Sequence, residues 1–129
     1  MNGELMYLVW VTVFTALLWI PYVLNRIAVR GINDTVGYPD NPKRLAPWAE
    51  RMKAAHGNAV ENLVIFAALV LAVQVLDANT AVTATAAAVY FWARVVHFIV
   101  YALGIPWLRT LAFAVGFFAQ MALAWVLLA

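Results

Sequence analysis

The sequence predicts an all-α integral membrane protein, a single domain folded as a four-helix up-down bundle. Three observations support this prediction. Of the 129 residues, 67% are hydrophobic and 11% are charged, against roughly 45–50% and 25% in soluble domains. The chain contains four long apolar segments, each close to the about 20 residues needed to cross a bilayer. The second and third connections are short, which makes the helices they join antiparallel neighbours.

The first helix is expected over residues 5–29. Its first twenty residues, Leu5–Leu24, carry no charge. No basic residue precedes them and no small-x-small cleavage pattern follows them, so we interpret the segment as a retained helix and not as a signal peptide. Pro21 is expected to kink this helix or to mark its last turns. The next segment, Gly31–Pro47, contains two glycines and three prolines and is predicted to be a loop.

Three further helices are expected over residues 48–76, 81–103 and 107–129. The polar turn Asp77–Thr80 separates the first two, and Gly104–Pro106 separates the last two. The length permits one domain of spanning helices and no second, soluble domain, so residues 1–129 are expected to form a single transmembrane domain.

The basic residues predict the orientation in the membrane. Six of them flank or occupy the first loop and a seventh lies at the third connection, on the same side: Arg26, Arg30, Lys43, Arg44, Arg51, Lys53 and Arg109. The opposite side has Glu4 and Asp77 and no Lys or Arg. The first loop is therefore expected in the cytoplasm, with both termini on the other side. For Lys43, Arg44 and Lys53 we expect no role beyond topology and contact with anionic headgroups.

The second helix has a polar face that extends into its apolar part. On a helical wheel a set of five polar side chains falls within about 120°; it consists of Glu50, Arg51, Asn58, Glu61 and Asn62. Glu61 lies about 16 Å beyond Glu50 along the helix axis. A carboxylate at that depth needs a partner or a water-filled pocket, because an unpaired charge in hydrocarbon costs at least a few kcal/mol. His56, on the opposite side, is expected to make a helix contact.

The third helix offers a partner of opposite charge. Tyr90, Arg94, His97 and Tyr101 share a stripe about 60° wide, and Arg94 and Glu61 lie at similar depths, roughly 15–20 Å from the basic side. We therefore predict a buried Glu61–Arg94 ion pair. Such a pair can form part of a binding cavity, or it can simply fix the register of two helices, and the residues alone leave both readings open.

The composition also bounds the chemistry. Without cysteine the protein has no thiol of its own, so thiol chemistry requires a thiol that arrives as a ligand. With two histidines on different helices and no cysteine, a metal site has only weak support. The chain has neither the repeat symmetry of a transporter nor an extended basic face for nucleic acid.

Two motifs resemble the signatures of the MAPEG family, the membrane-associated proteins in eicosanoid and glutathione metabolism. The first is Glu50-Arg51-x-x-x-Ala55-His56-x-Asn58-x-x-Glu61, and the second is Arg94-x-x-His97-x-x-x-Tyr101 followed by Pro106-x-x-Arg109. They stand in the expected order and on the expected helices. The chain is thus similar to bacterial-type members of the microsomal glutathione transferase and prostaglandin E synthase branches.

The resemblance implies a homotrimer that binds glutathione as co-substrate between subunits. The residues it assigns to glutathione are Arg26, Arg51, Asn58, Glu61, Arg94, His97 and Tyr101. It gives catalytic roles to Arg109, which would lower the pKa of the glutathione thiol, and to Tyr101, which would donate a hydrogen bond. The thiolate would then attack a hydrophobic electrophile or a lipid peroxide that arrives from the membrane lipid.

Three positions depart from the family pattern. Ala54 stands where the family often has an arginine, Gly57 where some members carry a basic residue, and Phe113 where some have tyrosine. Each change removes a possible polar contact to glutathione. The alternative to a transferase or peroxidase is therefore a non-catalytic lipid- or partner-binding membrane protein of the same fold, in the manner of the lipoxygenase-activating branch.

Overall fold

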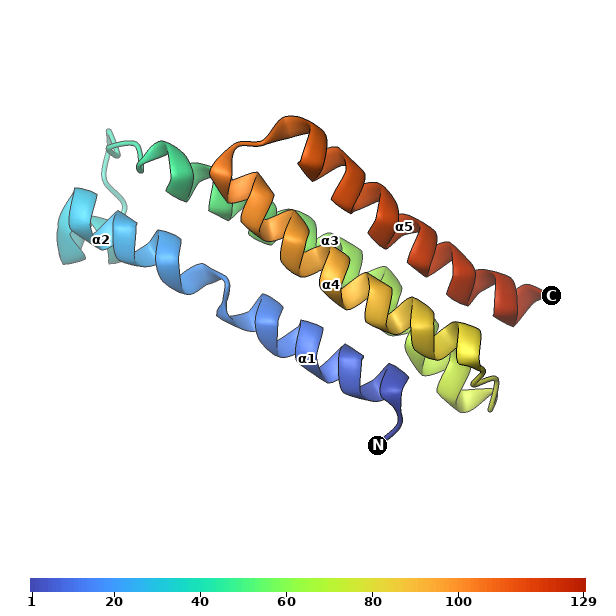
Figure 1. Cartoon of the computed structure of the whole chain (residues 1–129). Helices are drawn as coiled ribbons and strands as arrows, with labels where there is room; N and C mark the ends of the chain where they lie inside the picture. The colour runs from blue at the N-terminus through green and yellow to red at the C-terminus, as the bar shows by residue number, and fades with distance from the viewer.

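The computed structural model describes residues 1–129 and is entirely helical, with five helices. They are α1 (Gly3–Leu17), α2 (Trp19–Val36), α3 (Pro47–Val75), α4 (Ala81–Leu103) and α5 (Pro106–Leu128). Helices α1 and α2 lie end to end and form one crossing, so that four units are long and apolar enough to span a membrane. Successive units run in opposite directions (Figure 1). This confirms the predicted all-α membrane bundle.

The two ends of the bundle differ in charge. The loop between α2 and α3 and the turn between α4 and α5 share one end, which we call the basic end (Figure 1). The N-terminus, the turn between α3 and α4 and the C-terminus lie toward the other, which we call the acidic end (Figure 1). Every Lys and Arg but Arg94 lies near the basic end: six are in the first loop and the helix segments that adjoin it, and Arg109 is in the first turn of α5.

Helix α4 packs against α1, α3 and α5. Its contacts with α5 use small side chains such as Ala93, Ala112 and Ala119, which let two membrane helices approach closely. The main core lies toward the acidic end and includes Phe66 and Tyr90, whose rings stack with centroids 3.9 Å apart.

The first crossing is divided at Leu18, between α1 and α2. Pro21 has no N–H to donate to the carbonyl of Leu17, four residues earlier, so the helix cannot continue regularly through this point. Thr15, just before the break, donates its hydroxyl to the carbonyl of Val11 at 2.7 Å. The expected kink near Pro21 is therefore confirmed.

The expected loop 31–47 is partly wrong. Gly31 has φ 79°, a left-handed conformation that glycine adopts at little cost, and residues 32–36 then form another helical turn. Glycine here redirects the helix instead of ending it. The remaining loop is held by Arg30 Nε, which donates to Lys43 O at 2.7 Å, and by Asn25 Oδ1, which accepts from Ala46 N at 3.0 Å.

At the acidic end a buried carboxylate ties three elements together. Glu4 accepts hydrogen bonds from Thr83 Oγ1 at 2.9 Å and from Asn79 Nδ2 at 3.0 Å. Thr80 and Thr83 form a capping box at the start of α4. The start of α1 is thereby fastened to the turn and to α4.

Candidate functional site

The polar stripe predicted on α4 faces the interior of the bundle. Tyr90, Arg94 and His97 are nearly inaccessible, at 1%, 3% and 2% exposure, and Tyr101 is partly buried. Gly116 on α5 packs against this stripe, and a Cβ there would make ordinary contacts, 3.7 Å from Arg94 Cδ and 3.8 Å from the Tyr90 ring. The stripe is therefore part of the packed interior.

The predicted Glu61–Arg94 ion pair is wrong for the single chain. Arg94 Nη2 donates to Asn58 Oδ1 at 2.7 Å, and Glu61 lies exposed on the outer surface of α3. The reason is helical rotation: three residues after Asn58, the side chain of Glu61 points about 60° away from the direction of Asn58. The amide takes the place that the carboxylate was expected to fill.

Two amide side chains donate hydrogen bonds to backbone carbonyls of α3 close to Asn58. Gln120 Nε2 on α5 donates to Asn62 O at 3.0 Å, and Asn62 Nδ2 donates to Asn58 O at 2.9 Å. Since a guanidinium only donates, the Asn58 atom that faces Arg94 must be the carbonyl oxygen. The NH₂ group of Asn58 is therefore left as a donor for another partner.

Two adjoining cavities open beside this network at the basic end. The larger, of about 290 Å³, is lined by Asn58, His97, Tyr101, Arg109, Thr110 and Phe113. The smaller, of about 170 Å³, is lined by Arg51, Tyr101, Gly104, Ile105, Pro106 and Arg109. Tyr101 and Arg109 belong to both walls, and the Arg109 guanidinium carbon lies 4.7 Å from the Tyr101 ring centroid. The cavities bring cations and hydrogen-bond donors together without any carboxylate, a combination suited to an anion.

Arg51 also has a structural contact at this site. Its Nε donates to Ala102 O at 2.9 Å, which satisfies a carbonyl at the C-terminus of α4. Gly104, with φ 77°, ends α4 in the left-handed conformation, and a Cβ there would come within 3.3 Å of the Arg51 guanidinium. Glycine at this position therefore lets α3 hold the end of α4.

The structure brings together most, but not all, of the predicted site residues. Those that line the cavities are Arg51, Asn58, His97, Tyr101 and Arg109. Arg94 reaches the larger cavity only through Asn58. Arg26 on α2 and Glu61 on α3 line neither cavity of the single chain.

Four other residues at or near the site remain to be compared with the sequence prediction. His56 makes the expected helix contact, its Nδ1 lying 2.7 Å from the Tyr22 hydroxyl. Sequence reasoning missed Thr110, which lines the cavity, and Gln120 and Gly116, which support the network from α5. A signal existed for Gln120, the one strongly polar side chain in the last apolar segment, whereas nothing in the sequence marked Gly116.

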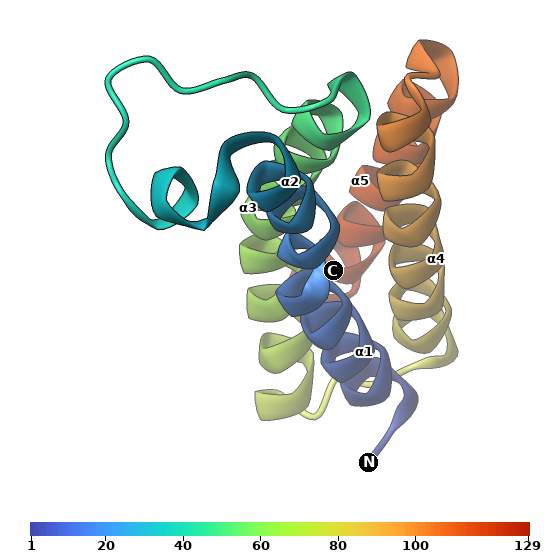
Figure 2. The same cartoon turned by 90° about the vertical axis from the view of Figure 1, so that its left-hand side faces the viewer.

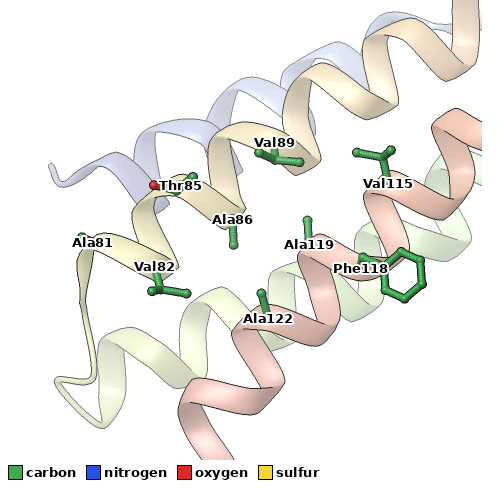
Figure 3. Close-up of a pocket in the computed structure, with 9 residues that line it drawn as sticks. All are labelled: Ala81, Val82, Thr85, Ala86, Val89, Val115, Phe118, Ala119 and Ala122. Carbon is green, nitrogen blue, oxygen red and sulfur yellow. The ribbon is translucent and has the colours of Figure 1, made fainter.

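A separate apolar groove runs along the outer side of α4 and α5. Figure 3 shows the part nearer the acidic end, where Ala81 to Val89 on α4 face Val115 to Ala122 on α5. This part has a volume of about 550 Å³. A second hollow of about 420 Å³ shares Val89 and Val115 with it and continues past Trp92 to Val96. Apart from the Thr85 hydroxyl, the lining side chains are hydrophobic, so this groove is suited to hydrocarbon.

Comparison with known proteins identifies the family. No curated protein matches the chain. The model of the MAPEG family matches residues 8–129, nearly the whole sequence, including both motifs and all four membrane-spanning units. The chain therefore belongs to the MAPEG family.

Proposed function

We propose that this protein is a membrane-bound, glutathione-dependent transferase or peroxidase that acts on hydrophobic electrophiles or lipid peroxides. The observation that carries the proposal is the position of Arg109, which lies against Tyr101 in the wall shared by the two cavities. The larger cavity is also lined by His97, whose buried Nδ1 has no hydrogen-bond partner in the protein. A small anion with several hydrogen-bonding groups satisfies such a surface.

Glutathione has the chemistry that this surface requires. Its carboxylates pair with Arg51 or Arg109, and the Asn58 NH₂ group donates to a carboxylate or carbonyl oxygen. A guanidinium beside the sulfur favours the thiolate over the thiol, and Tyr101 is placed to donate a hydrogen bond to it. The thiolate attacks the electrophilic carbon, a new carbon–sulfur bond forms and the leaving group departs, while the thiol proton passes to solvent.

The ammonium group of glutathione needs an acceptor that the cavities of one chain do not provide. Glu61 is exposed on α3, at a depth where a lone carboxylate facing lipid is unfavourable. In the homotrimer that we propose, Glu61 and Arg26 of a neighbouring chain complete the site. This arrangement accounts for the two predicted residues that lie outside the cavities of the single chain.

Binding and chemistry can be tested separately in purified protein. Glutathione and S-methylglutathione should both raise the unfolding temperature saturably, since both carry the charged groups, whereas only glutathione should react with 1-chloro-2,4-dinitrobenzene. Arg109→Gln should reduce both effects. Tyr101→Phe should retain most of the thermal shift and lose rate, because it keeps the ring against Arg109 and removes only the hydroxyl. If neither peptide shifts the unfolding temperature, the proposal is wrong.

A second candidate function has its own supporting observation. The apolar groove of about 550 Å³ between α4 and α5 favours a non-catalytic lipid-binding protein, and Ala54 and Gly57 supply no cation to a tripeptide. This alternative predicts that a fatty acid or phospholipid stabilises the protein and that glutathione does not. Val89→Trp, which fills the groove, should then abolish the stabilisation, while Arg109→Gln should leave it unchanged.

A further inference from the structure

The helical turn after Gly31 carries apolar side chains outside the bundle. Ile32 and Val36 lie one turn apart on the same side and are 59% and 75% exposed, and Tyr38, just beyond, is fully exposed. Figure 2 shows this turn and the following loop projecting sideways from the basic end. Such residues are unfavourable in water, and no other part of this chain covers them.

Exposed positive charges lie in the same segment. Lys43 and Arg44 are both exposed. From Arg26 to Lys53 the chain has six basic and three acidic residues, whereas the acidic end has no Lys or Arg. Within Ile32–Arg44 the exposed Asp34 and Asp40 balance Lys43 and Arg44, so the excess of positive charge comes from the flanking residues Arg26, Arg30, Arg51 and Lys53. Exposed apolar side chains in a basic end of this kind match the chemistry of a membrane surface that contains anionic lipid.

The loop is held in place and does not hang freely. Arg30 Nε donates to Lys43 O, Asn25 accepts from Ala46 N, and Glu50 Oε1 accepts from Leu45 N at 3.1 Å. The membrane-spanning helices α2 and α3 continue directly from its two ends. The apolar turn and the two cations are therefore kept near the level of the lipid headgroups.

We propose that Ile32–Arg44 is a membrane-surface element that binds anionic phospholipid headgroups. Ile32, Val36 and Tyr38 enter the headgroup layer, and Lys43 and Arg44 bind phosphate or carboxylate groups. The inference is independent of the glutathione proposal, because none of these residues lines either cavity. Each of the two cations favours docking on an anionic surface by roughly fivefold, so their joint loss should reduce it by more than tenfold at low salt.

The absence of cysteine in the chain makes a direct test possible. A single cysteine in Tyr38→Cys is labelled with a nitroxide, and the protein is placed in nanodiscs of phosphatidylcholine alone or of phosphatidylcholine mixed with phosphatidylserine. Access of a water-soluble nickel complex to the label reports its exposure. Phosphatidylserine should reduce this access several-fold, and either high salt or the added substitutions Lys43→Gln and Arg44→Gln should restore it.

The control places the label at the acidic end with Ala129→Cys, where the response to phosphatidylserine should be absent. The proposal would be overturned if the label at position 38 were equally accessible in both lipid compositions or equally shielded in both. It would also be overturned if the double glutamine variant behaved like the parent. A label shielded in detergent without phospholipid would also overturn it, because another protein copy would then cover the segment.

Discussion

Replacing Arg94 and Asn58 separately and together tests the central contact of the site. Arg94→Met keeps much of the side-chain volume but removes the guanidinium, and Asn58→Ala removes its acceptor. In the parent, Asn58→Ala leaves Arg94 without its one hydrogen-bond partner, whose Nη2–Oδ1 distance is 2.7 Å. A hydrogen bond to a charged group contributes about 1.5–3 kcal/mol. In the Arg94→Met background, Asn58→Ala should cost far less.

The assay is equilibrium unfolding of the parent, the two single variants and the double variant in mixed detergent micelles, monitored by tryptophan fluorescence. We expect a coupling free energy of about 1.5–3 kcal/mol between positions 94 and 58. Glu61→Gln should show no coupling with Arg94→Met beyond about 0.5 kcal/mol, the usual range for independent sites. Additivity at 94 and 58, combined with strong coupling at 94 and 61, would refute our description of the site and restore the ion pair that the sequence suggested.

Substitutions at three other positions test how glycine and the acidic end support the fold, each by thermal unfolding in detergent. Gly116→Ala should stabilise the protein by roughly 0.5–1 kcal/mol, because its Cβ makes ordinary contacts. Gly116→Leu should destabilise it by about 1–3 kcal/mol, because the larger side chain presses on Arg94 and Tyr90. Equal effects of the two substitutions would contradict the packing described. Gly104→Ala should cost about 1–2 kcal/mol because φ is 77°, and pairing it with Arg51→Ala should recover only the part due to the close approach to Arg51. Thr83→Val should cost about 1–3 kcal/mol, because Glu4 Oε1 loses its donor and only the bond from Asn79 to Oε2 remains. Glutathione binding should be unchanged, and a loss of binding would show that the two ends of the bundle are coupled.

The fold could be predicted from the sequence because membrane crossing imposes a simple requirement. Twenty-residue apolar segments must be helices, since every backbone polar group in the lipid needs an internal partner. The helical turn that follows Gly31 could not be predicted in the same way. A glycine in a Pro-rich and Gly-rich stretch indicates the end of a helix, and whether another turn follows depends on contacts made far along the chain, such as Arg30 with Lys43 O.

The sequence was enough to predict which residues of the candidate site share one face of α4, but not which residue binds Arg94. Helical periodicity alone placed Tyr90, Arg94 and His97 on one face of α4. The choice between Asn58 and Glu61 as the partner of Arg94 depended on the rotation of α3 about its axis, which periodicity leaves free because both residues lie on the same broad polar face. The apolar pattern of α5 could not reveal that Gln120 bonds to a backbone carbonyl on α3.

The interruption at Leu18 means that the first crossing consists of two segments with separate attachments. The N-terminal segment is fixed to the partner helices by Glu4, while the C-terminal segment, which carries Arg26, packs chiefly on α3. A change in tilt of the C-terminal segment therefore carries Arg26 and the following loop with it and leaves the N-terminal contacts intact. Adjustment at one face of the membrane can proceed while the opposite face keeps its structure.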